Sequence, residues 1–196
     1  MSLSARDLEL RAPIPAGGPD EQDLVEVATW TAAELEEALR EAPAPRPEQL
    51  LGWEFHGYNV ADYTALLGIR KFLKGFLEPE EDGEVIALGH NVRVRGRGGP
   101  LDPWEIVRRP DGEPLRHGFF DVRAPRAPDD LYPQALLLDY DCGRNPAWDP
   151  SARIRDYLVA LGPDLLLGKA YLAFGRRRLP VGFFVLERAW ELELEV

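Results

Sequence analysis

The sequence predicts a mainly β fold: an antiparallel β-barrel with an N-terminal helical extension and one or two short helices. Two observations predict it. About seven stretches of the 196-residue chain alternate apolar and polar residues with the period of two that strands require. The chain also contains 18 glycines and 18 prolines, which indicates many short turns. We favour a barrel over an open sheet because closure leaves no strand edge exposed.

The N-terminal segment, residues 1–47, is expected to precede the barrel domain of residues 48–196. Its first 22 residues are polar and read as a loosely ordered leader. Thr31-Ala-Ala-Glu34 is a capping box, so we expect a helix from there to Glu41 or Ala42. The proline-rich stretch 42–47 then ends that helix and serves as a linker or a strap.

The first elements of the barrel domain have two different periodicities. Residues 50–57 alternate in the manner of a half-buried strand. Residues 69–76 place their apolar side chains at helical spacing, which favours a short amphipathic helix. A strand remains an alternative there, because Gly68 and Gly75 bracket the run.

Strand patterns dominate the rest of the chain. Further strands are predicted over 85–95, 104–109, 115–122, 134–141, 165–174 and 181–193. One more short helix is predicted over 152–161, before Gly162-Pro163. Glycines inside these strand patterns indicate bends or close approaches; they are Gly89, Gly118, Gly168 and Gly182.

Composition excludes several classes of function. Thirty-four acidic and 23 basic side chains give a net charge of −11, which argues against general nucleic-acid binding and disfavours an anionic membrane surface. One cysteine rules out an internal disulfide and a cysteine-rich zinc site. No apolar run is long enough for a membrane span, and no secretory signal is recognisable. We therefore expect a cytoplasmic protein, with a homodimer as one possible state.

The three histidines are His56, His90 and His117. Their intervals match no metal-ligand spacing, so neither a metal nor another cofactor is expected. His90 falls in the same alternation as Ile86 and Val92, which suggests that it faces the barrel interior.

Asp139, Tyr140 and Asp141 form a polar group at the end of a predicted strand. The two carboxylates suit acid–base chemistry or a hard cation, whereas Asp141 also suits a simple turn. Asp139 follows three leucines, so it requires a partner such as Arg144 or Arg155.

A small basic face stands out on this acidic chain. It is formed by Arg70, Lys71 and Lys74. These cations would either steer an anionic ligand toward the barrel mouth or simply be solvated.

Two parts of the barrel domain resemble a known family. Gly52-Trp-Glu-Phe-His-Gly57, followed by residues 67–72, resembles the opening of bacterial proteins named for a Gly-x-Trp-x-Gly motif. Residues 164–168 and 179–188 resemble the C-terminal domain of unknown function in that family. The early tryptophan and late arginine are also distantly similar to lipocalin-like calycin barrels. That resemblance implies a calycin-like barrel with Arg188 packed across Trp53, and it implies no reaction.

The leading functional hypothesis is a small-molecule binding protein that holds an apolar or amphipathic ligand inside the barrel, with an anionic ligand as one alternative. Aromatic side chains and polar residues within apolar strands suggest such a pocket. Its candidate binding residues are Trp53, Tyr58, Arg70, Lys71, His90, His117, Asp139, Tyr140 and Arg188.

Two alternatives remain open. The first is a hydrolase, isomerase or cyclase that uses Asp139 or Asp141 with His90 or His117. The second is an interaction module, in which the proline-rich segment or the helix at 31–42 docks a partner or a second copy of the chain.

Overall fold

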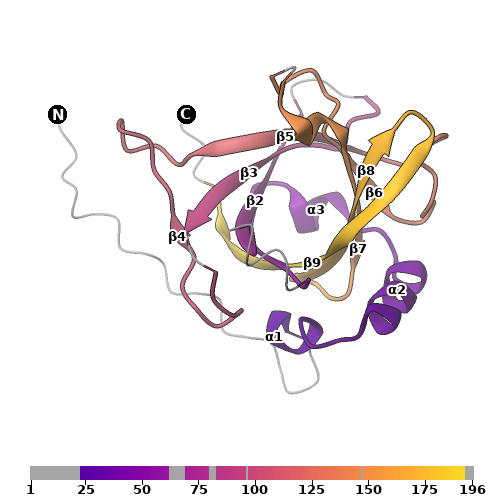
Figure 1. The fold of residues 1–196 in the computed structure, drawn as a ribbon, viewed down its shortest axis with the longest axis horizontal. Helices are drawn as coiled ribbons and strands as arrows, with labels where there is room; N and C mark the ends of the chain where they lie inside the picture. Colours follow the sequence, from indigo (N-terminus) through magenta and orange to yellow (C-terminus); the bar gives the residue numbers. More distant parts are fainter. Residues whose placement is uncertain (1–22, 62–68, 80–82, 96, 147, 193–196) are drawn as a thin grey trace.

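Eight antiparallel strands close into a barrel, and a ninth, short strand pairs with the end of one of them outside the ring (Figure 1). The computed structural model describes residues 23–61, 69–79, 83–95, 97–146 and 148–192. The barrel strands are β1 (Trp53–Asn59), β2 (Lys71–Leu77), β3 (Ala87–Arg95), β5 (Arg116–Arg123), β6 (Leu136–Asp139), β7 (Ile154–Ala160), β8 (Leu165–Phe174) and β9 (Arg177–Glu191). The predicted mainly β, antiparallel barrel is therefore confirmed.

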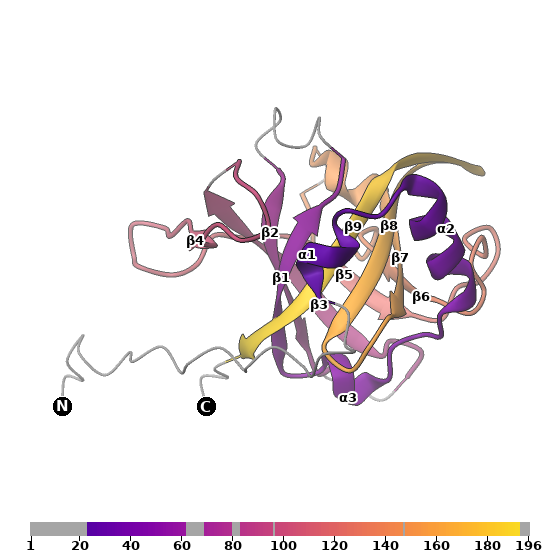
Figure 2. The same ribbon diagram turned by 90° about the horizontal axis from the view of Figure 1, so that it is seen from below.

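The barrel closes through β1, which pairs with β2 on one side and with β9 on the other. From β2 the ring continues through β3, β5, β6, β7 and β8 to β9. The additional strand β4 (Glu105–Ile106) pairs with the end of β3. It belongs to an arm, residues 97–115, that projects beside the barrel (Figures 1 and 2).

The predicted helix over residues 69–76 is wrong, because this segment forms strand β2. Both of its edges pair, one with β1 and the other with β3. Phe72 and Phe76 pack in the barrel interior, whereas Leu73 packs on the outer face. Burial on both faces removes the clean alternation of a half-exposed strand, so the apolar spacing mimics a helix.

The predicted helix over residues 152–161 is wrong for the same reason. A 3-10 turn, η1 (Pro150–Arg153), leads directly into strand β7. The five central residues of β7 are all buried. The sequence of a strand that is covered on both faces is a nearly continuous run of apolar residues. Sequence periodicity does not distinguish such a run from a buried helix.

Two N-terminal helices cover one outer flank of the barrel (Figure 2). They are α1 (Leu24–Val27) and α2 (Ala32–Glu41). The predicted capping box is confirmed, since the Thr31 hydroxyl accepts from the Glu34 amide while the Glu34 carboxylate accepts from the Thr31 amide. The predicted leader, residues 1–22, lies outside the described residues.

The proline-rich segment continues as a strap across the barrel. The Pro43 carbonyl accepts from the Ala160 amide at 2.8 Å. The short helix α3 (Pro47–Leu50) follows, and its Leu50 side chain is fully buried in the interior cluster. Helix α3 lies at the end of the barrel opposite the β8–β9 hairpin, so this end is closed (Figure 2).

Apolar side chains pack in three separate groups. One packs inside the barrel and includes Phe55, Phe76 and Leu138. A second lies between the helices and the outer faces of β7, β8 and β9. A third joins the arm to β2 and β3. Within the described ranges, no helix is long and apolar enough to cross a lipid bilayer.

Candidate ligand-binding site

Trp53 and Arg188 lie at the closed end of the barrel. The predicted contact is present: the Arg188 guanidinium lies 4.5 Å from the centre of the Trp53 ring. Arg188 also pairs with Asp164 at 2.6 Å and donates to the Gln49 carbonyl at 3.1 Å. These bonds fasten α3 and the β7–β8 connection across the barrel end, which is a structural role.

His90 does not face the interior as predicted. Its ring packs against Gly75, which alternates along β2 with the inward-facing Lys74 and Phe76. On this outer face the Nε2 atom lies 3.6 Å from the Glu54 carboxylate. The error arises because the outer face of β3 is apolar too: Val92, in the same alternation as His90, packs in the outer group beneath the arm and not in the interior.

The residues of the proposed acid–base pair are held apart from one another. Asp139 pairs with Arg123 at 2.6 Å and with Arg155 at 3.2 Å. Asp141 is exposed, and His117 is exposed on β5. Arg155 is thus one of the two predicted partners of Asp139, and the other, Arg144, pairs with Asp121 instead. No carboxylate and imidazole of this set are in hydrogen-bond contact among the described residues.

Three further predicted residues lie on the outer surface of the barrel. Tyr58 packs in the outer cluster beneath the helices, and its hydroxyl accepts from Arg70 at 2.7 Å. Lys71 is buried beneath the arm, where its ammonium lies 3.7 Å from the Trp104 ring centre and donates to the carbonyls of Asp102 and Pro103. The predicted role of Lys71 at the mouth is therefore wrong, because this cation fastens the arm.

Tyr140 is a predicted site residue that enters the interior, and it belongs to a buried polar cluster. The Lys74 ammonium donates to the Tyr140 hydroxyl at 2.6 Å and to Asp156 Oδ2 at 3.1 Å. The Tyr140 hydroxyl in turn donates to the same Oδ2 at 3.0 Å. We call Lys74, Tyr140 and Asp156 the inner cluster; their exposed fractions are 1%, 3% and 3%.

Aromatic rings surround the inner cluster. The Lys74 ammonium lies between 4.6 and 5.6 Å from four ring centres, which are those of Phe72, Phe120, Tyr140 and Phe184. The Phe184 ring sits against Gly168, where a Cβ atom would lie 2.1 Å from it. Glycine is required at that position because any side chain would occupy the space of the ring.

Burial shifts the protonation equilibria of the cluster. It lowers the pKa of the Lys74 ammonium, and the Asp156 carboxylate partly opposes this shift. It raises the pKa of Asp156, against the opposing effect of Lys74. It also raises the pKa of the Tyr140 hydroxyl, which stays protonated at neutral pH. The pair is held together by mutual neutralisation in a medium that penalises each charge alone.

One polar atom of the inner cluster is left over. Asp156 Oδ1 is buried and accepts no hydrogen bond from the described residues. On the other side of Tyr140, the Asn91 amide donates to the tyrosine hydroxyl and to the Gly118 carbonyl, at 3.2 Å each. An unmatched buried carboxylate oxygen is costly in a folded protein, which makes it the chemically significant feature of this interior.

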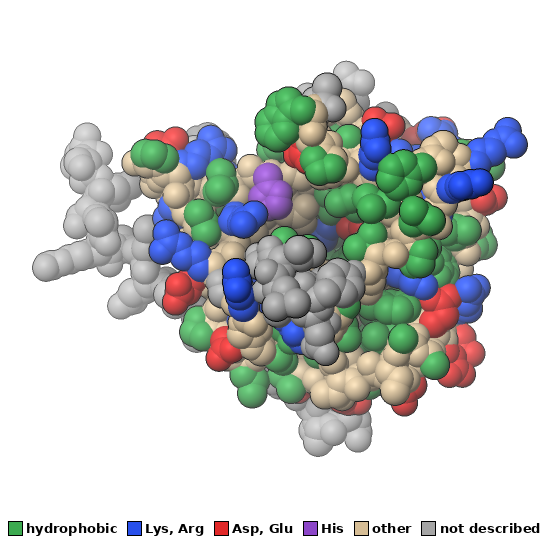
Figure 3. Space-filling model, in the orientation of Figure 1, with side chains coloured by type: hydrophobic (Ala, Val, Ile, Leu, Met, Phe, Trp, Pro, Cys, Tyr) green, Lys and Arg blue, Asp and Glu red, His purple; other side chains and the backbone are tan. Residues whose placement is uncertain are grey.

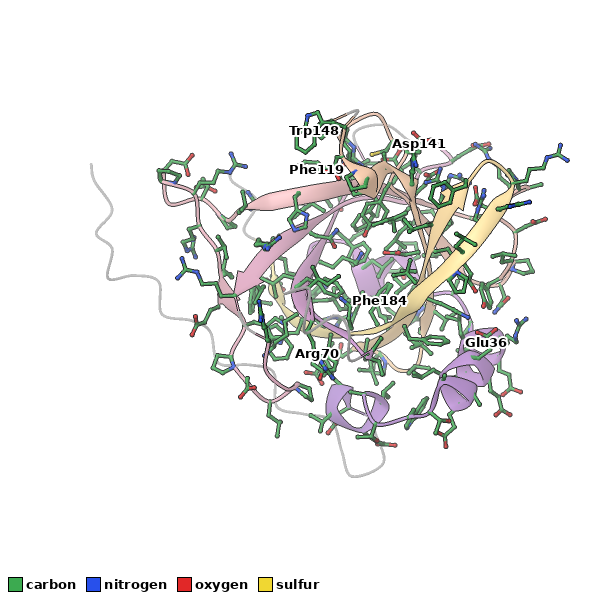
Figure 4. All side chains as sticks on the ribbon, in the orientation of Figure 1. Glu36, Arg70, Phe119, Asp141, Trp148 and Phe184 are labelled. Carbon is green, nitrogen blue, oxygen red and sulfur yellow. The ribbon has the colours of Figure 1, made fainter. Side chains whose placement is uncertain are left out.

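One end of the barrel lies opposite α3. We call this end the mouth; the β6–β7 connection, residues 140–153, and the β8–β9 hairpin border it. Exposure rises toward it, since Phe72, Asn91 and Ile154 are only partly buried. In Figure 4 the labelled Phe184 lies inside the ring of strands and Trp148 lies at its rim.

The described residues bring together no group of three or more histidine, cysteine or carboxylate side chains that suits a metal ion. The chemistry available in the interior is instead hydrogen bonding by an ammonium, a phenol and a carboxylate.

Sequence reasoning missed Asp156 and Asn91, and it placed Lys74 on a basic outer face, whereas its side chain is buried in the interior. Lys74 and Asp156 lie on the two strands that helical periodicity hid, and a strand assignment of residues 71–77 would have placed Lys74 between inward-facing Phe72 and Phe76. That apolar–lysine–apolar alternation is the signal that was available.

Comparisons with known proteins provide little guidance. No family model matches the chain, and none of the curated proteins matches it. One similar solved structure is described as a protein from Thermomonospora curvata; it is 18% identical over 82% of this chain and 89% of that chain, with a TM-score of 0.49. Similarity at this level carries no argument about function.

Proposed function

We propose that the protein binds a small, neutral, amphipathic molecule inside the barrel, with its polar group against the inner cluster. The observation that carries this proposal is the buried Asp156 Oδ1, which lacks a hydrogen-bond donor among the described residues. A ligand that donates to this oxygen would satisfy it.

The hydrogen-bonding capacity of the cluster indicates the kind of polar group. An ammonium carries three donors, and Lys74 uses two of them within the cluster. One donor on Lys74 and one acceptor on Asp156 therefore remain. A hydroxyl or a primary amide offers the complementary acceptor and donor in a single group.

The charge of the cluster indicates a neutral ligand. Lys74 and Asp156 neutralise one another inside the barrel. A ligand with a net charge would add an uncompensated charge to this buried site, at a cost of several kcal/mol. This favours a neutral polar group over the anionic ligand considered from the sequence.

The apolar part of the ligand would extend toward the mouth. Phe72 and Phe184 border the cluster, and the inward-facing residues of β8 continue with Ala170 and Leu172 toward the hairpin. The side chains between the inner cluster and the mouth are therefore apolar, as a site for an amphipathic ligand requires.

Native mass spectrometry of freshly purified protein provides the first test. We expect an excess mass that is lost on denaturation. A Lys74→Met/Asp156→Leu variant should lose it, whereas the matched variant Lys169→Met/Glu36→Leu, outside the barrel, should keep it. If both variants retain the same bound mass, the ligand lies elsewhere.

Calorimetry with defined probes tests the ligand class. We expect 1-octanol to bind the wild type more tightly than octanoate, because octanoate brings a negative charge to a balanced site. Tighter binding of octanoate, or equal binding of 1-octanol by wild type and the Lys74→Met/Asp156→Leu variant, would contradict the proposal.

A further inference from the structure

Exposed apolar and basic side chains lie together around the mouth. The apolar members are Trp148, Phe174 and Leu179, with exposed fractions of 83%, 45% and 51%. The basic members are Arg153, Arg176 and Arg177, all exposed. We call these six residues the rim patch.

The rim patch joins two segments that are distant in the sequence. Arg153 belongs to the β6–β7 connection, and its guanidinium lies 5.3 Å from the centre of the Phe174 ring on β8. Leu172 pairs with Leu179 across the hairpin and with Ile154 on β7. The exposed apolar surface thus continues inward along the wall that leads to the inner cluster.

The local charge at this rim opposes that of the whole chain, whose net charge is −11. None of the three arginines forms an ion pair within the described part of the chain. Of the nearby carboxylates, Asp129 pairs with Arg178, Asp141 pairs with Arg155 and Asp149 caps η1, while Asp130 is exposed. Figure 3 looks onto this end and shows blue and green side chains around the hairpin, with red side chains gathered over α2.

We infer that the rim patch docks the mouth of the barrel on the surface of an anionic lipid bilayer. Tryptophan, phenylalanine and leucine side chains enter the boundary between headgroups and acyl chains, while arginines are attracted to anionic headgroups. The acidic flank of α2 is repelled by the same surface, so only one orientation is favourable. Docking extends the proposed function, because an amphipathic ligand would then pass directly between bilayer and barrel.

Vesicle flotation of the full chain tests the inference. We expect binding at low salt to vesicles of phosphatidylcholine that contain about 30% of the anionic lipid phosphatidylglycerol. Binding to vesicles of pure phosphatidylcholine should be much weaker. Added salt should reduce binding, since screening weakens the arginine contribution. Failure to bind the anionic vesicles at low salt would overturn the inference.

Matched charge variants locate the docking surface. Arg176→Ala/Arg177→Ala should weaken binding about 30-fold, since each basic residue near an anionic surface contributes about a factor of five. The control Arg46→Ala/Arg126→Ala removes two exposed arginines remote from the mouth and should bind almost as wild type. Equal losses in both variants would mean that overall charge, not the rim patch, controls binding.

The tryptophan of the rim patch supplies an independent readout. Emission of the wild type should shift to the blue on anionic vesicles, and Trp148→Phe should abolish most of that shift while vesicle binding persists. A solution dimer that dissociates on Trp148→Ser would assign the patch to a second copy and overturn the inference. Rim variants should still bind 1-octanol, so failure of docking is distinguishable from failure of the proposed function.

Discussion

Two clusters of the same chemical groups occupy opposite sides of the barrel wall. The inner cluster joins Lys74, Tyr140 and Asp156. An outer cluster joins three residues: Lys169 on β8, Glu36 on α2, and Tyr132 between β5 and β6. The Lys169 ammonium lies 2.6 Å from the Glu36 carboxylate, and the Tyr132 hydroxyl donates to the same carboxylate at 2.9 Å. Figure 4 shows the labelled Glu36 on the outer helix, away from Phe184 in the interior.

The outer cluster is explained by the fold. It connects α2 to β8, and further bonds complete it: Tyr171 shares a hydrogen bond with Tyr132 at 2.8 Å, and Arg40 pairs with Glu36 at 2.6 Å. The same helix is also held by Gln134, which donates to the Leu39 carbonyl. This helix therefore packs on its own barrel, which weakens the alternative that it docks a partner.

The inner cluster has no comparable structural task. Lys74 lies on β2, Asp156 lies on β7 and Tyr140 directly follows β6, and these strands are already joined into the barrel by backbone pairing. It costs desolvation of two charges and leaves one carboxylate oxygen unmatched. The comparison teaches that the same three groups fasten a helix to the barrel at the surface, whereas in the interior, where no such task exists, we propose that they bind a ligand.

Removing one charge of the inner cluster should have the largest effect. Asp156→Ala leaves the Lys74 ammonium buried without its carboxylate, so the free energy of unfolding should fall by about 3–5 kcal/mol. Urea denaturation of the variant measures the loss. Should Asp156→Ala fail to fold, Lys74→Met provides the reciprocal test, and a loss below about 1 kcal/mol in either variant would contradict the described burial.

The next largest effect is a pH dependence of the free energy of unfolding, which comes from His56 on the outer side of the barrel. His56 is stacked on Trp104 with ring centres 4.3 Å apart; burial, together with the nearby Lys71 ammonium, lowers its pKa to about 4. The unfolded chain binds the proton near pH 6.5, so stability should rise as pH increases from about 4 to 6.5.

We expect this contribution to be on the order of 3 kcal/mol, because a shift of one pKa unit corresponds to about 1.4 kcal/mol. Denaturation midpoints of wild type and His56→Phe across that range measure it, because phenylalanine keeps the stacking and cannot be protonated. An unchanged slope in the variant would assign the pH dependence to other groups.

A smaller effect is expected in the outer cluster. Glu36→Gln keeps the tyrosine hydrogen bond and removes an ion pair whose side chains are partly exposed to water. The loss of stability should be about 0.5–1 kcal/mol and should shrink in high salt. A loss as large as that of Asp156→Ala would remove the distinction between the clusters.

The smallest expected change comes from replacing both charges of the inner cluster. Lys74→Met/Asp156→Leu exchanges a buried ion pair for apolar groups of similar size, so stability should lie within about 1 kcal/mol of wild type. Equilibrium unfolding beside the single variants provides the comparison. Destabilisation equal to the sum of the single losses would show that the cluster is needed for the fold itself.

The barrel was predictable because its strands carry local signals. Alternation located β1, β3, β5 and β9 to within a few residues, and the capping box at Thr31 located the start of α2. The close approach predicted at Gly168 is present, as is the packing of Arg188 on Trp53. The strands and the helix start were predictable because their signals lie in residues close together in the sequence. The other two features each depend on one contact that the sequence already suggested.

The site was not predictable for a physical reason. Lys74 and Asp156 lie on strands buried on both faces, where periodicity does not distinguish a strand from a helix. The sequence favours a helix for both segments, with a strand as the alternative for the first. Their contact also joins residues 82 positions apart. Tyr140 was identified because it stands in a polar group at the end of a recognisable strand.

Lysine side-chain NMR during a titration with 1-octanol tests the central claim most directly. The chain contains three lysines, Lys71, Lys74 and Lys169, so the spectrum should be simple and the Lys74→Met and Lys169→Met variants assign it. We predict that the Lys74 signal moves in a saturable manner while the Lys169 signal stays in place. A titration in which Lys74 does not move, or in which Lys169 moves equally, would contradict a ligand site in the barrel interior.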